Sequence, residues 1–163
     1  MLYWGITKIL ITRYFFYGRS HSMAVLKTAK YVRKASVEAT FTPKQVPSAI
    51  PEIISDETFG NYGFHTYTEM IIEAYTMVDK PHKHDFSQYL FFFGGDARDL
   101  INLGGVVEMS LGEDIDKMEK HVITQATAIY IPAGIYHCPL VFKEVTRPIA
   151  LTDIYFAANY ERK

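Results

Sequence analysis

The feature that most constrains the fold is a series of short apolar runs, separated by turn residues, that begins after Gly63 and continues to the end of the sequence. Short runs rich in aromatic and β-branched residues are typical of strands. We expect strands near residues 66–77, 87–93, 104–111, 120–124, 127–131, 137–143 and 147–157. Between some of them lie the turn sequences Gly94-Gly95-Asp96, Gly112-Glu113-Asp114 and Pro132-Ala133-Gly134. Strands that follow one another through short turns predict antiparallel sheets, and therefore an all-β sandwich or barrel.

The composition agrees with one all-β domain. The 163 residues include 11 Phe and 12 Tyr, and 48% of the chain is hydrophobic. A chain of this size buries enough apolar surface to build one well-filled core. The sequence shows no internal repeat and no low-complexity tract, so we expect a single domain.

The first 37 residues differ in charge from the rest of the chain. They carry seven Lys and Arg and no acidic residue, whereas the remainder has 10 Lys and Arg against 18 Asp and Glu. We interpret residues 1–22 as an N-terminal extension, either a targeting segment or an added start, and residues 23–163 as the domain. Because Lys8 and Arg13 interrupt its apolar stretch, this extension is too charged to predict a membrane-spanning helix. No nucleic-acid-binding motif accompanies the basic residues, so neither a membrane nor a nucleic acid is expected as a partner.

The sequence contains one cysteine, Cys138. A single cysteine excludes an intramolecular disulfide and a zinc site built from several thiolates. Low cysteine usage is typical of a reducing compartment, so we expect a cytoplasmic protein.

Two histidines flank one residue in Pro81-His82-Lys83-His84. Side chains alternate along an extended segment, so both imidazoles point to the same side, and Gln88 lies at a further even offset. Such a pair alone is common on exposed strands. A third imidazole comes from His137, which follows the turn at Pro132 and opens another apolar strand. Imidazoles that converge from two distant strands predict a metal site.

These residues and their spacing resemble the two sequence motifs of the cupin family. The first motif has two histidines around one residue, then a carboxylate and a glycine, and the second has proline, glycine and histidine. The matching positions are His82, His84, Gln88 and Gly95 in the first motif and Pro132, Gly134 and His137 in the second. The departures are Thr76 and Ala126 in place of glycines, Val141 in place of asparagine, and Gln88 in place of glutamate. The resemblance covers about residues 66–157.

The resemblance implies a jelly-roll barrel, or double-stranded β-helix, that holds one divalent ion of Fe, Mn, Ni, Co or Zn. Its ligands here would be His82, His84, Gln88 and His137. Cupin activities include dioxygenation, decarboxylation, isomerisation and lyase reactions, and the fold does not choose among them. We expect a metal-dependent enzyme, an oxidoreductase or a lyase, that acts on a small organic molecule. The alternative is a non-catalytic barrel with a lapsed metal site that binds or senses a small molecule.

Gln88 changes the expected charge of the metal site. A glutamine carbonyl oxygen can coordinate a divalent ion, but it brings no negative charge. The positive charge of a bound metal would therefore be left uncompensated by its ligands. We expect weaker metal retention, a stronger Lewis acid and a preference for an anionic ligand or substrate.

Other side chains are weaker candidates for the site. Tyr130 and Tyr136 flank the second turn and could donate a hydrogen bond to a ligand, and Glu73 could act as an acid or base. Glu69 and Glu73 share one face of their strand, which we expect to face solvent. Cys138 should point away from the metal site, into the core or an interface. The histidines outside the motifs, read as surface or structural residues, are His21, His65 and His121.

The strand that follows the first motif is apolar on both faces. Tyr89, Phe91 and Phe93 alternate with Leu90 and Phe92. This is more apolar surface than one small barrel needs, so we predict a homodimer formed through sheet faces or an exchanged N-terminal strand. The alternative is that the first 60 residues cover this surface within one chain.

Overall fold

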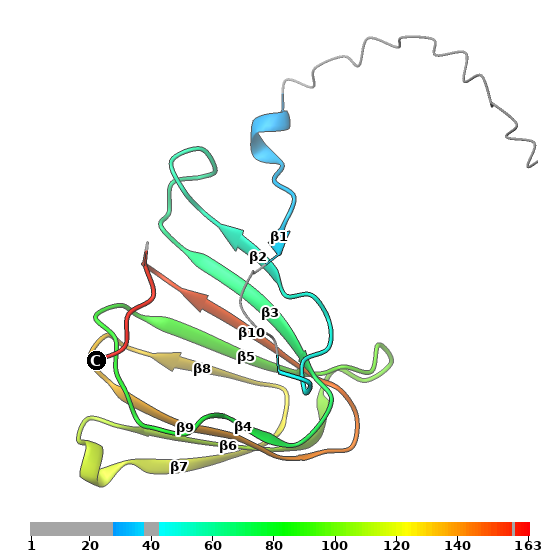
Figure 1. Cartoon of the computed structure of the whole chain (residues 1–163), viewed down its shortest axis with the longest axis vertical. Coiled ribbons are helices and arrows are strands. Elements are labelled where there is room, and N and C mark those ends of the chain that lie inside the picture. Colours follow the sequence, from blue (N-terminus) through cyan, green and yellow to red (C-terminus); the bar gives the residue numbers. More distant parts are fainter. Residues whose placement is uncertain (1–27, 38–42, 158) are drawn as a thin grey trace, which may run out of the picture.

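The computed structural model describes residues 28–37, 43–157 and 159–163, and these form two antiparallel β-sheets that face each other (Figure 1). The strands are β1 (Ser36–Val37), β2 (Pro51–Ile54), β3 (His65–Ile71), β4 (Tyr75–Val78), β5 (Gln88–Gly94), β6 (Asn102–Gly112), β7 (Glu119–Gln125), β8 (Thr127–Ile131), β9 (Tyr136–Val145) and β10 (Ile149–Tyr155). Two short 3₁₀ turns, η1 (Ala29–Tyr31) and η2 (Ile115–Lys117), are the helical elements of the described residues. The prediction of an all-β jelly roll is confirmed.

The larger sheet has the strand order β1-β2-β3-β10-β5-β8, and the smaller has the order β4-β9-β6-β7. Strands that follow one another along the chain often lie in opposite sheets, as β3 and β4 do, and as β5 and β6 do. The last strand, β10, lies between β3 and β5 and is antiparallel to both. The two sheets are therefore tied together by the path of the chain as well as by their packing.

The inward faces of the two sheets share one apolar core. Phe92 of β5 and Phe142 of β9 are fully buried, and their ring centroids lie 6.4 Å apart across the two sheets. Along β10, buried residues alternate with half-buried ones, as expected for a strand with one face on the core. The buried residues of this strand include Leu151 and also Asp153, which interrupts an otherwise apolar face.

The single strand predicted for residues 66–77 is wrong. The structure divides this region into β3, which pairs with β10 in the larger sheet, and β4, which pairs with β9 in the smaller. The chain crosses between the sheets at the exposed residues 72–74. The crossing contains no glycine or proline, so the sequence gives no turn signal at the break.

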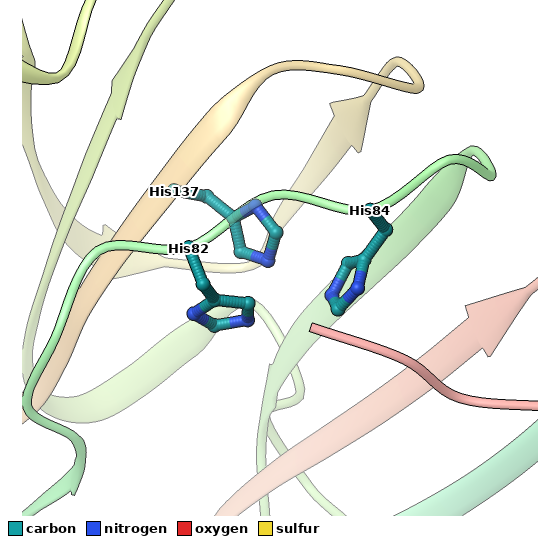
Figure 2. Close-up of side chains that lie close together, drawn as sticks. All are labelled: His82, His84 and His137. Carbon is teal, nitrogen blue, oxygen red and sulfur yellow. The ribbon is translucent and has the colours of Figure 1, made fainter. Parts of the chain in front are cut away.

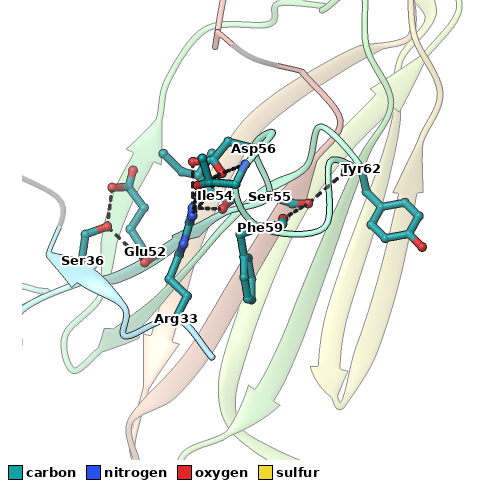
Figure 3. Close-up of polar contacts among 9 residues, drawn as sticks. Arg33, Ser36, Glu52, Ile54, Ser55, Asp56, Phe59 and Tyr62 are labelled. Atoms are coloured by element: carbon teal, nitrogen blue, oxygen red, sulfur yellow. Dashed lines mark hydrogen bonds and ion pairs between the residues drawn. The ribbon is translucent and has the colours of Figure 1, made fainter. Parts of the chain in front are cut away.

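Of residues 28–37, Ser36 and Val37 form the edge strand β1 of the larger sheet, and Arg33 bonds to residues at and just after the end of β2 (Figure 3). Its guanidinium donates hydrogen bonds of 2.8 and 3.1 Å to the two carboxylate oxygens of Asp56, and one of 2.9 Å to the carbonyl oxygen of Ile54. The bonds from Arg33 hold the pKa of Asp56 well below its ordinary range. The N-terminal region therefore extends a sheet edge through β1 and β2.

The predicted extension of residues 1–22 lies outside the described residues, and its interpretation stays a prediction. None of the helical elements in the described ranges is long and apolar enough to cross a membrane.

Gly105 of β6 lies where a side chain does not fit, because a Cβ atom there would be 2.1 Å from the carbonyl oxygen of Glu144 in β9. Gly105→Ala must push these two paired strands apart. We expect it to lower the free energy of unfolding by about 2–3 kcal/mol, measured by urea denaturation. Ser110→Ala on the same strand is the control, with an expected change of about 0.5 kcal/mol or less. Equal stability of the two variants would contradict this packing.

Candidate metal centre

The imidazoles of His82, His84 and His137 lie close together (Figure 2). His82 and His84 lie on the segment that joins β4 to β5, and His137 is the second residue of β9. The backbones of His82 and His137 exchange two hydrogen bonds of 3.1 and 2.9 Å, and the Gly134 amide donates one of 2.7 Å to the carbonyl oxygen of His84. The two motifs are thus fixed to each other through their main chains. The ring centroids of the three histidines lie 4.2 to 4.9 Å apart.

The hydrogen bonds of the rings fix which nitrogen faces the cavity. Nδ1 of His82 donates to the carbonyl oxygen of Lys80 at 3.3 Å, Nδ1 of His137 donates to that of Ile135 at 3.2 Å, and Nδ1 of His84 donates to that of Glu161. A carbonyl oxygen can only accept, so each ring carries its proton on Nδ1 and has a free lone pair on Nε2.

The free ring nitrogens fit a metal ion. Nε2 of His82 and Nε2 of His84 are buried and have no hydrogen-bond partner among the described residues. The potential ligand atoms of the three histidines all lie within 4.8 Å of one another. A metal-binding histidine usually donates the N–H of one ring nitrogen to a carbonyl or carboxylate and keeps the other nitrogen free for the metal. His82, His84 and His137 could therefore hold a metal ion.

Burial lowers the pKa of all three histidines. The pKa of His137 falls to about 4, and those of His82 and His84 also lie below their ordinary value, in each case chiefly because burial disfavours the charged ring. The rings are therefore neutral near pH 7, as metal coordination requires.

Gln88, the first residue of β5, is buried beside the histidines and lines the same cavity of about 150 Å³. Its Nε2 donates a hydrogen bond of 2.6 Å to Oδ2 of Asp153. Its Oε1 is buried and has no hydrogen-bond partner among the described residues. An amide whose nitrogen is held by a carboxylate presents its oxygen elsewhere, so this oxygen is available to a metal.

Asp153 is the main residue of the site that the sequence analysis missed. It is 2% exposed, it lines the cavity, and its Oδ2 also accepts a hydrogen bond of 2.8 Å from the hydroxyl of Tyr67. Burial raises its pKa to about 6, although the bonds from Tyr67 and Gln88 act in the opposite direction. The signal was present, because Asp153 shares the inward face with Ile149 and Leu151 in an alternating strand.

The raised pKa of Asp153 predicts a pH-dependent stability. The ordinary pKa is 3.8 and the pKa in the folded protein is about 6. The folded state therefore favours the protonated carboxyl, and its contribution to stability is fully present below pH 3.8 and is lost as the pH rises through about 6. In metal-free protein, the free energy of unfolding of Asp153→Asn relative to wild type should therefore rise by about 2–3 kcal/mol as the pH increases from about 4 to 7, measured by urea unfolding. A difference that does not change with pH would contradict the burial of this charge.

The residues that follow β10 contribute to the site and were also missed. Residues 159–163 run beside the segment that carries His82 and His84, where the backbones of Lys163 and Lys83 exchange hydrogen bonds of 3.0 and 3.2 Å. Glu161 supplies the carbonyl that holds His84, and the Tyr160 ring lies 4.6 Å from the His84 ring. His82 and His137 bond to carbonyls two residues away, whereas His84 depends on this distant segment.

Removal of residues 159–163 should weaken metal binding, because it takes away the carbonyl that orients His84. We expect a 10- to 100-fold lower affinity for Mn²⁺, measured by isothermal titration calorimetry on protein whose circular dichroism spectrum is unchanged. Glu161→Ala is the matched control, since it keeps the carbonyl and should bind like wild type. Unchanged affinity in the shortened chain would show that the segment does not support the site.

The weaker sequence candidates lie away from the cavity. Glu73 is exposed and pairs with Lys44 at 3.5 Å, because it lies in the crossing between β3 and β4. Tyr130 points outward from β8 and is 51% exposed. The Tyr136 ring lies 4.6 Å from Nζ of Lys83, and Tyr136 does not line the cavity. We do not include these three residues in the proposed site.

Two expectations about neighbouring side chains need correction. Glu69 does not simply face solvent, since it is half-buried and lines the cavity. Cys138 is buried like His137 and also lines the cavity, because its φ of 74° breaks the alternation of β9. Burial raises the pKa of this thiol to about 12, so it stays protonated.

His65 bonds to Glu52 and Tyr155, and His121 is exposed. His21 lies outside the described residues.

The comparisons with known proteins give structural but no sequence matches. No family model and no curated protein matches the chain. A recombinant oxalate oxidase in complex with glycolate matches with a TM-score of 0.52 and 16% identity, over 82% of this chain and 62% of that one. A mutant oxalate decarboxylase from Bacillus subtilis matches with a TM-score of 0.52 and 10% identity, over 77% of this chain and 29% of that one.

A vicilin from hazelnut, Corylus avellana, matches with a TM-score of 0.52 and 12% identity, over 82% of this chain and 36% of that one. The chain thus spans less than two thirds of each of these three structures. Similarity at this level of identity establishes the fold, and the activity has to be argued from the site. The two facing sheets, the histidines brought together from both motifs and these structural matches show that the chain has the cupin fold.

Proposed function

We propose that the protein is a metal-dependent enzyme that binds one divalent ion through His82, His84 and His137, with Gln88 as a fourth, neutral ligand. The observation that carries this proposal is the pattern of ring hydrogen bonds, in which each Nδ1 bonds a backbone carbonyl while Nε2 of His82 and of His84 has no hydrogen-bond partner among the described residues. A histidine that only packs in the core, or that hydrogen-bonds through both ring nitrogens, would not need an unpartnered Nε2. Fe, Mn, Ni, Co and Zn all accept imidazole and amide ligands.

The proposed substrate is a small anionic organic molecule. Four neutral ligands leave the charge of a divalent ion uncompensated, and a bound anion would reduce it. The cavity of about 150 Å³ accommodates a compact molecule, comparable to the cavities that hold a single benzene ring. When bound, the metal would supply Lewis-acid or redox chemistry to this molecule. The reaction is of the oxidase or dioxygenase, decarboxylase, lyase or isomerase type.

The residues of the chain would orient the reactants and handle protons. Asp153 fixes the amide of Gln88 through Oδ2 and keeps Oδ1 without a hydrogen-bond partner among the described residues. A buried carboxylate with a free oxygen can take up or release a proton at that oxygen. The hydroxyl of Tyr67 holds the other oxygen of the same carboxylate in place.

The cell compartment and the oligomeric state are part of the proposal. The single cysteine is a free thiol and is compatible with the cytoplasm. On the outer face of β5, the rings of Tyr89, Phe91 and Phe93 stack with centroids 6.1 and 6.3 Å apart, and Phe93 is 39% exposed. This aromatic face supports the proposed homodimer.

His84→Ala tests the proposed function. We expect the variant to lose at least tenfold in affinity for Mn²⁺ and Fe²⁺, because one of three imidazole ligands is gone, and to lose any turnover of small carboxylates in parallel. Bound metal is measured by inductively coupled plasma mass spectrometry after equilibrium dialysis. His121→Ala, which removes an exposed histidine of β7, should behave as wild type. A wild-type protein that binds carboxylates without metal, and a His84→Ala variant that binds them equally well, would instead support the non-catalytic binding barrel.

A further inference from the structure

Arg162 lies where the segment 159–163 passes over the metal cavity. The backbone pairing of Lys163 with Lys83 fixes this segment on the strip of chain that carries His82 and His84. The side chains of Lys163 and Asp85 form an ion pair beside it. Arg162 is therefore held at the mouth of the cavity by its neighbours, even though its own side chain is exposed.

The position of Arg162 brings its charge close to the candidate metal ligands. It lines the cavity that His82, Gln88 and His137 also line. Its positive charge is one of the causes that lower the pKa of His82, His84 and His137, although burial is the larger cause. A cation next to a metal site weakens the binding of a metal, so its presence here is not explained by metal retention.

A second cavity of about 210 Å³ adjoins the first, and Arg162 belongs to both. Tyr67 and Tyr160 are also shared, so these three side chains form the partition between the two spaces. The guanidinium carbon of Arg162 lies 5.6 Å from the centroid of the Tyr160 ring. The second cavity is lined further by His65, Tyr155 and Glu52, which are bonded to one another. A ligand in the metal cavity therefore meets phenol hydroxyls and a guanidinium at its outer end.

Two acidic side chains, Asp153 and Glu69, lie on the wall of the metal cavity, and their charge is smaller than the combined positive charge of a divalent ion and Arg162. Oδ2 of Asp153 accepts hydrogen bonds from Tyr67 and Gln88. Glu69 lines the cavity from β3, and it also has an interaction partner of its own. A metal ion together with Arg162 would give this space a net attraction for an anion. A guanidinium presents a planar fork of donors that matches the two oxygens of a carboxylate.

We infer that Arg162 is the carboxylate-recognition residue of this protein and that its ligand is a compact carboxylate. This ligand binds between the three histidines and the partition formed by Tyr67, Tyr160 and Arg162. The inference rests on the proposed function for the position of the metal. It adds the substrate class and names a specificity residue outside both sequence motifs. The carboxylate would bind next to the metal ligands while the guanidinium pairs with its charge.

The test compares Arg162→Gln with wild type, using glycolate and its neutral analogue glycolamide as probes. Glycolate binding is measured by calorimetry on Mn²⁺-loaded and on metal-free protein, and Mn²⁺ affinity is measured separately. Wild type should prefer glycolate to glycolamide. Arg162→Gln should bind glycolate at least tenfold more weakly, the loss expected for a charge-assisted hydrogen-bonded pair, and should bind Mn²⁺ as well as wild type or better.

Arg98→Gln is the matched control, because Arg98 is exposed and lies in the loop between β5 and β6. It should bind both glycolate and Mn²⁺ as wild type does. Equal glycolate affinity in Arg162→Gln and wild type, or no glycolate binding by wild type in either metal state, would overturn the inference. Failure of wild type to bind Mn²⁺ or Fe²⁺ would overturn the proposed function instead, and the metal-free glycolate titration would still decide the role of Arg162.

Discussion

Three hydrogen bonds from imidazole Nδ1 atoms to backbone carbonyls determine what this site can do. They put the proton of each ring on Nδ1 and leave Nε2 as the potential ligand atom, and the potential ligand atoms of the three histidines lie within 4.8 Å of one another. The carbonyls belong to Lys80, Ile135 and Glu161, which come from three separate parts of the chain. Both motifs and the segment after β10 must therefore be in place before the three nitrogens converge. The fold, the tautomers of the histidines and the candidate metal site are parts of one arrangement.

The second constraint is the neutral charge of the ligand set. Gln88 has its nitrogen on Asp153 and its amide oxygen without a hydrogen-bond partner among the described residues. The negative charge that a glutamate would bring is thus found one side chain further out, on a buried carboxyl that is also held by Tyr67. A charge at this distance stabilises a bound metal less than a directly coordinated one, because the attraction falls with separation. A metal bound here would thus be weakly compensated, and together with Arg162 at the mouth of the cavity it would favour an anionic ligand.

Much of the fold and the centre of the site could be predicted from the sequence. Alternation in an extended segment placed His82 and His84 on one side, and the turn before His137 brought the third imidazole to the start of a strand. The break between β3 and β4 could not be predicted, because no glycine or proline marks the crossing. Asp153 was readable in principle from its inward position on β10, but a single acid in an apolar strand carries no motif.

The contribution of Glu161 and Arg162 could not be predicted at all. Glu161 acts through its backbone carbonyl, which every residue possesses, and Arg162 acts through a position that depends on the pairing of Lys163 with Lys83. Contacts of this kind arise only when the whole barrel is assembled. They explain why the candidate metal ligands were predicted from the sequence, whereas the contributions of Glu161 and Arg162 were not.

The most direct test of this account is anomalous X-ray diffraction from crystals of untagged protein grown with Mn²⁺. We expect one strong anomalous peak at roughly 2 Å from the Nε2 atoms of His82, His84 and His137. A peak at another place, or no peak in crystals grown with excess Mn²⁺, would contradict the proposed metal centre. The barrel would then be a binding module without a metal.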